Sequence, residues 1–142
     1  EATQRGVTIL LPQDHIVAPE LKAGVPFATT SGREIPADQL GVDIGPKSRQ
    51  VFVSAVQSAR TILWNGPMGV FEIPPFDRGT RALADAVAAT DSYSVAGGGD
   101  TVAALTQAGL AEKISHISTG GGASLEFLEA GDLPGLAALR DE

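Results

Sequence analysis

The chain has 142 residues, of which 43% are hydrophobic and 19% charged, which is enough apolar material for the core of one domain and too much for a disordered segment. Its formal net charge of −7 argues against nucleic acid or an anionic membrane as the main partner. The absence of cysteine excludes disulfides and thiolate metal sites. No apolar run approaches the roughly twenty residues that cross a bilayer, and no signal peptide is visible, so we expect a cytoplasmic protein.

The first segment has the features of a helix end, because Arg5 is followed by Gly6 at a position that often terminates a helix. The chain begins without Met and without the helix that this stop would end, so we expect it to be the later piece of a longer protein. Residues 7–11 form an apolar run ended by a proline, which predicts a buried strand. Prolines and glycines interrupt residues 16–44, which predicts a loop or a small antiparallel excursion with a candidate strand at 25–30.

The rest of the chain predicts strands and helices in alternation. Helices are predicted at 47–60, 80–89, 100–108 and 122–130, strands at 61–64, 93–96 and 114–118, a loop at 68–76, and a short apolar segment at 136–139. Thr80 is predicted to cap the second helix, and Gly109 and Gly131 to follow the ends of the last two. This order is typical of the α/β class, in a Rossmann-like three-layer α/β/α arrangement with a mainly parallel sheet.

Two glycine triplets, 97–99 and 120–122, each lie between a strand-like run and a helix-like run. Glycine lets backbone N–H groups approach a ligand, and a helix beginning there directs its free N–H groups at the same place. In parallel sheets, ligands bind beyond the carboxyl ends of the strands. The loops at 65–72, 97–101 and 119–124 should therefore share one rim, and we predict an anion site there, most plausibly for nucleotide phosphates.

The local pattern leaves alternatives open at both triplets. Asp100 is either the N-cap of a tight turn or a ligand of Mg²⁺, since a carboxylate facing a phosphate needs a cation between them. Three glycines exceed what such a turn requires, which favours the functional alternative. The second triplet has no acid, and its features fit a phosphate cradle and close helix–strand packing equally well.

Standard fingerprints are absent, because the chain has no Gly-Lys-Ser/Thr tripeptide and neither loop fits the dinucleotide pattern. Glu72 is either a solvated loop charge or an acceptor for ribose hydroxyls. His15 and His116 have no partners at metal-ligand or triad spacing, and we expect His116 in the core or at the rim and Trp64 in the core. No Ser-His-Asp set or carboxylate pair can be assembled, which fits phosphoryl transfer, a reaction dominated by positioning and charge neutralisation.

Four segments resemble phosphoglycerate kinase in their sequence, their order and their separations. They are GVDIGPK at 41–47, LWNGPMGVFE at 63–72, GGGDT at 97–101 and HISTGGGAS at 116–124. The resemblance covers essentially the whole chain, down to the closing Leu133-Pro134-Gly135. It implies that residues 1–142 are the later portion of the carboxyl-terminal, nucleotide-binding domain of a two-domain kinase. The domain is then incomplete in this chain, and the full-length kinase is expected to be monomeric.

The resemblance also implies a reaction and a set of site residues. The reaction is the glycolytic phosphotransfer between 1,3-bisphosphoglycerate and MgADP, giving 3-phosphoglycerate, whose carboxyl group is the acceptor in reverse, and MgATP. The implied nucleotide-binding residues are Gly41 at the base and ribose, Glu72 at the ribose hydroxyls, Asn65 and Pro67 beside the nucleotide, Gly98, Gly99 and Thr101 at the phosphates, and Asp100, which binds the Mg²⁺. The implied catalytic residues are Gly120, Gly121 and Gly122, whose amides would face the transferred phosphoryl group.

In the family that the chain resembles, the sugar-acid substrate and a catalytic arginine lie on the amino-terminal domain, and a glycine-lysine segment opens the nucleotide domain. Neither is present in this sequence. We therefore expect the chain to supply part of the nucleotide and magnesium site and to be inactive alone, with residues 133–142 packing on the absent domain. Two alternatives stay open: a non-catalytic nucleotide-binding module, and a structural α/β domain with glycine turns.

Overall fold

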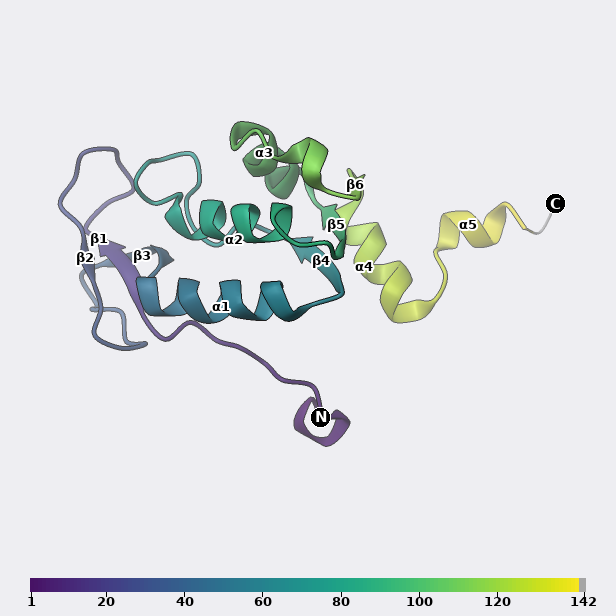
Figure 1. Ribbon diagram of the computed structural model, residues 1–142, viewed down its shortest axis with the longest axis horizontal. Helices are drawn as coiled ribbons and strands as arrows, with labels where there is room; N and C mark the ends of the chain where they lie inside the picture. Colours follow the sequence, from purple (N-terminus) through teal and green to yellow (C-terminus); the bar gives the residue numbers. More distant parts are fainter. Residues whose placement is uncertain (141–142) are drawn as a thin grey trace.

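The structure, a computed structural model, describes residues 1–140 (Figure 1). The strands are β1 (His15–Ala18), β2 (Ala28–Thr29), β3 (Leu40–Ile44), β4 (Thr61–Asn65), β5 (Tyr93–Gly97) and β6 (His116–Ser118). The helices are α1 (Pro46–Ser58), α2 (Arg78–Ala88), α3 (Gly99–Gln107), α4 (Gly121–Ala130) and α5 (Pro134–Ala138), with short 3-10 helices η1 (Thr3–Arg5) and η2 (Ala111–Lys113). None of the helices in this part of the chain is both long and apolar enough to span a membrane.

A parallel sheet of three strands in the order β4-β5-β6 forms the centre of the fold. Alternation along the strands sends Trp64 and Ala96 into a buried cluster with residues of α1, α2 and α3. Leu63 and Val95 point to the opposite face, where they line an apolar groove together with residues of α4. Helices therefore lie on both faces of a parallel sheet, which confirms the predicted α/β class.

A second sheet of three strands, in the order β2-β1-β3, is antiparallel. It confirms the predicted antiparallel excursion, although the sequence pattern predicts only β2 as a separate strand. This sheet has its own small core, in which Ile16, Ala18 and Val42 are buried with Phe76. The ring of Phe27 packs edge-on against Phe76, with 6.0 Å between the ring centroids.

The predicted buried strand at 7–11 is wrong. Val7 is 56% exposed and Ile9 66% exposed, and no strand among residues 1–140 pairs with this segment. Hydrophobicity alone cannot make a strand, because the backbone also needs a neighbour for its N–H and C=O groups. Figure 1 shows the segment running past α1 to η1, where Gly6 has a φ of 68°, so the predicted helix stop is confirmed.

The four predicted helices of the central region are confirmed, each within two residues of its predicted bounds. Gly109 and Gly131 follow α3 and α4 in left-handed conformations, with φ of 70° and 75°, as predicted. The predicted cap at Thr80 is wrong, because α2 begins two residues earlier. Thr80 is buried inside the helix, where its Oγ1 accepts a hydrogen bond of 3.1 Å from the N–H of Met68.

The start of α1 is closed by a buried carboxylate from the segment before β1. Asp14 accepts hydrogen bonds from the N–H of Ser48 at 2.8 Å and of Lys47 at 3.1 Å, and from Ser48 Oγ at 2.6 Å. Burial raises the pKa of Asp14, but these hydrogen bonds and the charge of Lys47 lower it more, so the pKa lies below its usual value of 3.8.

Replacing Asp14 with Ala should lower the free energy of unfolding by about 2–4 kcal/mol, because it leaves the buried N–H groups of α1 without partners. A carboxyl group with a depressed folded pKa stabilises the fold above its unfolded pKa, and this contribution is lost as pH falls through the folded pKa. The difference between the two proteins should therefore be full at neutral pH and shrink below about pH 4. Urea unfolding followed by the fluorescence of Trp64 measures it, and a difference below about 0.5 kcal/mol at neutral pH would contradict the capping role.

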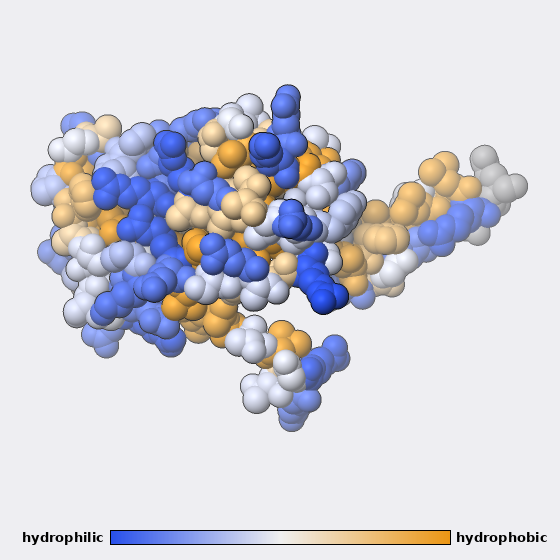
Figure 2. Space-filling view, viewed as in Figure 1, coloured by the Kyte–Doolittle hydropathy of each residue, from blue (hydrophilic) through white to orange (hydrophobic). Residues whose placement is uncertain are grey.

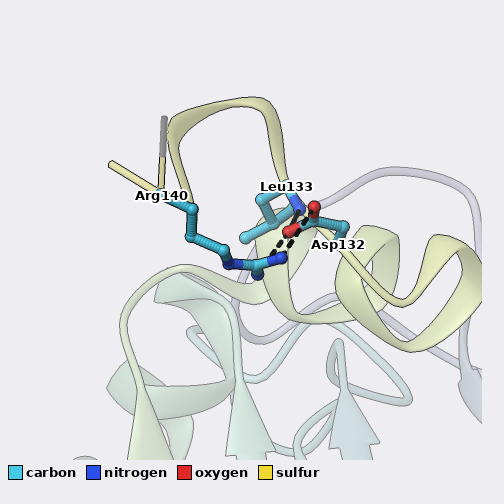
Figure 3. Close-up of polar contacts among 3 residues, drawn as sticks. All are labelled: Asp132, Leu133 and Arg140. Carbon is cyan, nitrogen blue, oxygen red and sulfur yellow. Dashed lines mark hydrogen bonds and ion pairs between the residues drawn. The ribbon is translucent and has the colours of Figure 1, made fainter. Parts of the chain in front are cut away.

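The carboxyl-terminal segment extends away from the body through α4 and α5, and Figure 2 shows apolar side chains along it. Arg140 donates to both carboxylate oxygens of Asp132, at 2.7 and 3.2 Å, and Asp132 also accepts from the N–H of Leu133 (Figure 3). The side chain of Arg140 is 62% exposed, so this pair contributes at most about 1 kcal/mol. The packing of residues 133–142 on another domain stays a prediction, and residues 141–142 lie outside the described part.

Candidate functional site

The carboxyl ends of the three parallel strands lie side by side. The register places Asn65 opposite Gly97 and Gly97 opposite Ser118. The N–H of Gly98 donates to the carbonyl oxygen of Ser118 at 3.3 Å, which joins the first triplet to the end of β6. The three loops predicted to share a rim therefore begin on one rim of the sheet.

The two glycine triplets touch each other through their backbones. A Cβ on Gly121 would collide with the backbone N of Gly98 and lie 2.7 Å from its Cα. A Cβ on Gly97 would lie 3.2 Å from the Cα of Gly121, which is tighter than ordinary side-chain contacts. Gly98 has a φ of 91°, which L side chains rarely adopt. Close packing, one of the two alternatives for the second triplet, therefore accounts for Gly121.

At the other glycines of the triplets, close packing does not exclude a side chain. A Cβ added to Gly99 or Gly122 would meet no described atom within 4 Å. A Cβ on Gly120 would make an ordinary contact of 3.8 Å with the Cβ of Ala123. These positions leave space at the rim, where a side chain would stand between a ligand and the backbone amides.

The helices α3 and α4 both begin at this rim with open amino termini. The first hydrogen bond of α3 runs from the N–H of Val102 to Gly98 O, and that of α4 from the N–H of Ser124 to Gly120 O. The N–H groups of residues 99–101 and 121–123 consequently have no partner within their helices. Within residues 1–140, no side chain caps either start.

The other two long helices differ, since buried carboxylates accept hydrogen bonds from their first turns. Asp14 occupies this position at α1, and Asp43 at α2, where its Oδ2 accepts from the N–H of Gly79 at 2.8 Å. Among these four helices, and within the described residues, only the two that begin at the rim have no side-chain acceptor for the N–H groups of their first turn. Free N–H groups at the positive end of the helix dipole favour a bound anion.

Asp100 lies at the edge of this arrangement, exposed, as the second residue of α3. The N-cap position belongs to Gly98, so the interpretation of Asp100 as the N-cap is wrong. Among the described residues, no group of three or more His, Cys, Asp or Glu side chains could hold a metal by itself. A single exposed carboxylate beside an anion site fits Mg²⁺, which takes one or two carboxylates and completes its coordination with phosphate oxygens and water.

Thr101 and Asn65 connect the first triplet to the loop after β4. Thr101 is fully buried, and its Oγ1 accepts a hydrogen bond of 2.7 Å from the N–H of Gly66. The carbonyl oxygen of Gly66 accepts from Nε1 of Trp64 at 2.7 Å, and Trp64 is buried as predicted. Asn65 Oδ1 lies so near Gly98 that a Cβ there would be 2.7 Å away. The side chain of Thr101 thus positions the loop.

Replacing Thr101 with Val keeps the shape of the side chain and removes the only acceptor that it offers to Gly66. We expect a loss of about 1–3 kcal/mol in unfolding free energy, because a partly buried N–H is left unpaired, and faster hydrogen exchange at the Gly66 amide. Thr106→Val on the exposed side of the same helix is the matched control, since it removes a hydroxyl that only donates to Val102 O. Equal exchange rates at Gly66 in both variants would contradict the positioning role.

Gly41 and Pro67 meet at a groove between the two sheets. The groove is lined by Pro12, His15, Ile35, Gly41, Val42, Asp43, Ile44, Pro67, Met68, Gly69 and Val70. It therefore brings together two of the predicted nucleotide residues from β3 and from the loop after β4.

Glu72 is exposed and does not line this groove. The preceding residue, Phe71, is buried, and its carbonyl oxygen accepts from Nε2 of Gln107 at 3.4 Å, which holds this part of the loop beside the end of α3. His116 is exposed on β6 and does not belong to the core. His15 lines the groove, a position that its spacing does not predict.

Asp43 is the residue that the sequence interpretation missed. It is 4% exposed, and its Oδ1 accepts from the N–H of Ile44 at 2.8 Å. Burial raises the pKa of Asp43 to about 6, although the hydrogen bonds from Gly79 and Ile44 lower it. The available signal was a carboxylate between two apolar residues, Val42 and Ile44, in a strand.

Fold and rim together define an α/β protein with two open helix starts at the carboxyl ends of its parallel strands, where ligands bind in proteins of this class. A family model described as phosphoglycerate kinase matches residues 1–131. The chain belongs to the phosphoglycerate kinase family.

Two relatives illustrate the similarity in sequence. The chain is 54% identical to phosphoglycerate kinase of Thermus thermophilus over 135 residues, which are 94% of this chain and 35% of that protein. It is also 54% identical to phosphoglycerate kinase of Chlorobium phaeovibrioides over 144 residues, covering 99% of this chain and 36% of that protein. The chain thus spans about a third of the length of these curated relatives.

Solved structures give the same result for the fold. Phosphoglycerate kinase from Coxiella burnetii superimposes with a TM-score of 0.88 at 44% identity, covering 96% of this chain and 35% of that one. Phosphoglycerate kinase from Pyrococcus horikoshii gives a TM-score of 0.75 at 34% identity, with 91% of this chain and 32% of that one covered.

Proposed function

We propose that this chain is the nucleotide-binding part of a phosphoglycerate kinase, which transfers a phosphoryl group between 1,3-bisphosphoglycerate and MgADP to give 3-phosphoglycerate and MgATP. The observation that carries the proposal is the pair of open helix starts at one rim. The N–H groups of residues 99–101 and 121–123 offer two adjacent anion sites, and two are needed because the phosphates of the nucleotide and the phosphoryl group in transfer must be held together.

The two triplets have different parts in this reaction. The backbone of Gly98 borders the nucleotide phosphates, and the free N–H groups of residues 99–101 bind them beside the carboxylate of Asp100. The amides of Gly120, Gly121 and Gly122 stabilise the charge that develops on the phosphoryl group during transfer. The backbone contact between Gly97 and Gly121 keeps the two sets of amides at a fixed separation.

Asp100 is the residue that would hold Mg²⁺. The ion would neutralise the negative charge of the phosphates. The chain has a net charge of −7 and only 10 Lys and Arg side chains, so its own side chains supply little positive charge for this purpose. The exposed carboxylate leaves the remaining coordination positions to phosphate oxygens and water.

The groove between the sheets receives the base and the ribose. Gly41 lies on one wall, where the side chain of Ile35 packs against it, and Pro67 lies on the other. Glu72 does not line the groove but stands exposed farther along the same loop, where its carboxylate would accept hydrogen bonds from ribose hydroxyls that project out of the groove. Asn65, at the start of this loop, places its Oδ1 close to Gly98 in the first triplet.

The phosphoglycerate site lies on the amino-terminal domain of the kinase, so the 142-residue chain alone binds nucleotide without turnover. Calorimetry with MgADP and a coupled assay of phosphoryl transfer, both run on the chain and on the full-length protein, test the proposal. We expect MgADP binding by both and transfer by the full-length protein only. Binding by both without transfer by either would instead favour the non-catalytic module, and binding by neither would refute a nucleotide site.

A further inference from the structure

We propose that Asp43 is a positioning residue that fixes the loop after β4 against β3 and so sets the width of the nucleoside groove. The inference rests on the proposed function, because it concerns the subsite for base and ribose. Asp43 is not one of the residues that the resemblance assigns to the nucleotide.

The carboxylate of Asp43 is enclosed by backbone from two other elements. Its Oδ2 accepts from the N–H of Gly79 in the first turn of α2, and its Oδ1 accepts from the N–H of Ile44. A Cβ on Gly69 would lie 2.5 Å from Oδ1, and a Cβ on Gly79 would collide with the same atom. Both neighbours therefore come within van der Waals distance of the carboxylate because neither has a side chain.

These contacts act on the wall of the groove. Gly69 and Val70 line it from the loop, and Val42 lines it from β3. The N–H of Val70 donates to the carbonyl oxygen of Val42 at 2.9 Å, one residue away from Asp43. The backbone bond thus holds this stretch of loop to β3, and the carboxylate of Asp43 packs against Gly69 in the same stretch while it is hydrogen-bonded to Ile44 and to α2. Without the carboxylate, a space opens between Gly69 and Gly79, and the two walls lose their fixed separation.

The nearby charges make this contact sensitive to pH. Burial is the main cause that raises the pKa of Asp43, and the charge of Asp77, before α2, raises it further. The hydrogen bonds from Gly79 and Ile44 and the charge of Arg49 in α1 lower it, and the resulting pKa is about 6. His15, from the strand paired with β3, lines the same groove. A protonated carboxyl group accepts well at only one oxygen, so one of the two N–H groups loses its acceptor when Asp43 is protonated.

Adenosine is the suitable probe, because it carries neither phosphate nor metal and so reports on the groove alone. Its Kd is measured by NMR titration on the full-length protein between about pH 5 and pH 8, together with KM and kcat for MgADP. For the wild type, we expect adenosine affinity to fall several-fold as pH drops through about 6. Asp43→Asn should weaken adenosine binding about tenfold at pH 8 and remove this pH dependence, with KM raised more than kcat is lowered.

Two further variants sharpen the test. Arg49→Gln removes the positive charge that lowers the pKa of Asp43, so the midpoint of the pH dependence should move upward while the affinity at pH 8 is unchanged. Asp77→Asn is the matched control: it changes another buried acid, which pairs with Arg81 at 3.6 Å and does not line the groove. Its adenosine affinity at pH 8 should equal that of the wild type.

Several results would overturn the inference. One is an adenosine Kd within about twofold of the wild type in Asp43→Asn, even if unfolding free energy drops. Another is a pH dependence that persists in Asp43→Asn, because it would then not come from Asp43. If Asp43→Asn does not fold, an unmoved midpoint in Arg49→Gln decides against the inference. If the wild type binds MgADP and adenosine and the variants bind adenosine equally well, only the positioning role of Asp43 is refuted. If the wild type binds neither MgADP nor adenosine, the proposed function is refuted as well.

Discussion

Asp100→Ala in the full-length kinase should lower kcat/KM for MgADP by about a hundredfold to a thousandfold, the cost of removing one electrostatic group from the transfer site. Asp100 is exposed and makes no capping bond in α3, so the unfolding free energy should change by no more than about 0.5 kcal/mol. The remaining activity should need a higher Mg²⁺ concentration. Initial rates at varied Mg²⁺, with urea unfolding in parallel, provide the measurement.

Asp91→Ala is the control for this variant. Asp91 is equally acidic and exposed, but it precedes β5 and therefore lies at the end of the parallel sheet opposite the rim. Its kinetics should match those of the wild type. If Asp100→Ala also kept its Mg²⁺ dependence and its rate, Asp100 would be a solvated surface charge and not a ligand of the metal.

Gly121→Ala should be strongly destabilising, because the new Cβ would collide with the backbone of Gly98. Overpacking in a rigid environment costs about 1–3 kcal/mol, and here the clash falls on backbone at the end of β5, which is held in register with β6. We expect a loss at the upper end of that range, together with loss of transfer activity. Urea unfolding and the coupled assay measure the two effects.

Gly122→Ala, one residue farther along, separates packing from chemistry. A Cβ there would meet no described atom within 4 Å, and alanine favours a helix more than glycine does by up to about 1 kcal/mol. Stability should therefore hold or rise, while the methyl group narrows the approach to the amides and lowers kcat. Unchanged kcat in Gly122→Ala would contradict the placement of the phosphoryl group at this helix start.

The rim could be predicted from the sequence because its geometry follows from a general rule. Parallel strands end on the same side of a sheet, so the glycine runs after β5 and β6 had to lie on the same rim once the alternating order was recognised, and the strand order then made them neighbours. The sequence could not show which individual glycine is required by packing and which leaves space for a ligand. Only the structure distinguishes Gly121, held by packing, from Gly122, beside open space.

The buried acids could not be predicted because their partners are distant in the sequence. Asp14 meets Ser48 across 34 positions and Asp43 meets Gly79 across 36. In the local sequence, Asp14 and Asp43 are only acidic residues next to or within a strand. The local sequence does not specify which helix donates its N–H groups to each of them. The strand predicted at 7–11 failed for a related reason: its pattern is correct for a strand, but pairing depends on a neighbour that local sequence does not specify.

The central claim is that the open starts of α3 and α4 hold the phosphates of one nucleotide and the phosphoryl group in transfer. A crystal structure of the full-length protein with MgADP and 3-phosphoglycerate tests it most directly. We predict phosphate oxygens within hydrogen-bond distance of the amides of residues 99–101, Mg²⁺ on the carboxylate of Asp100, and the amides of 121–123 facing the gap between the two substrates. Phosphates bound away from both helix starts, or a metal without Asp100 among its ligands, would contradict the account.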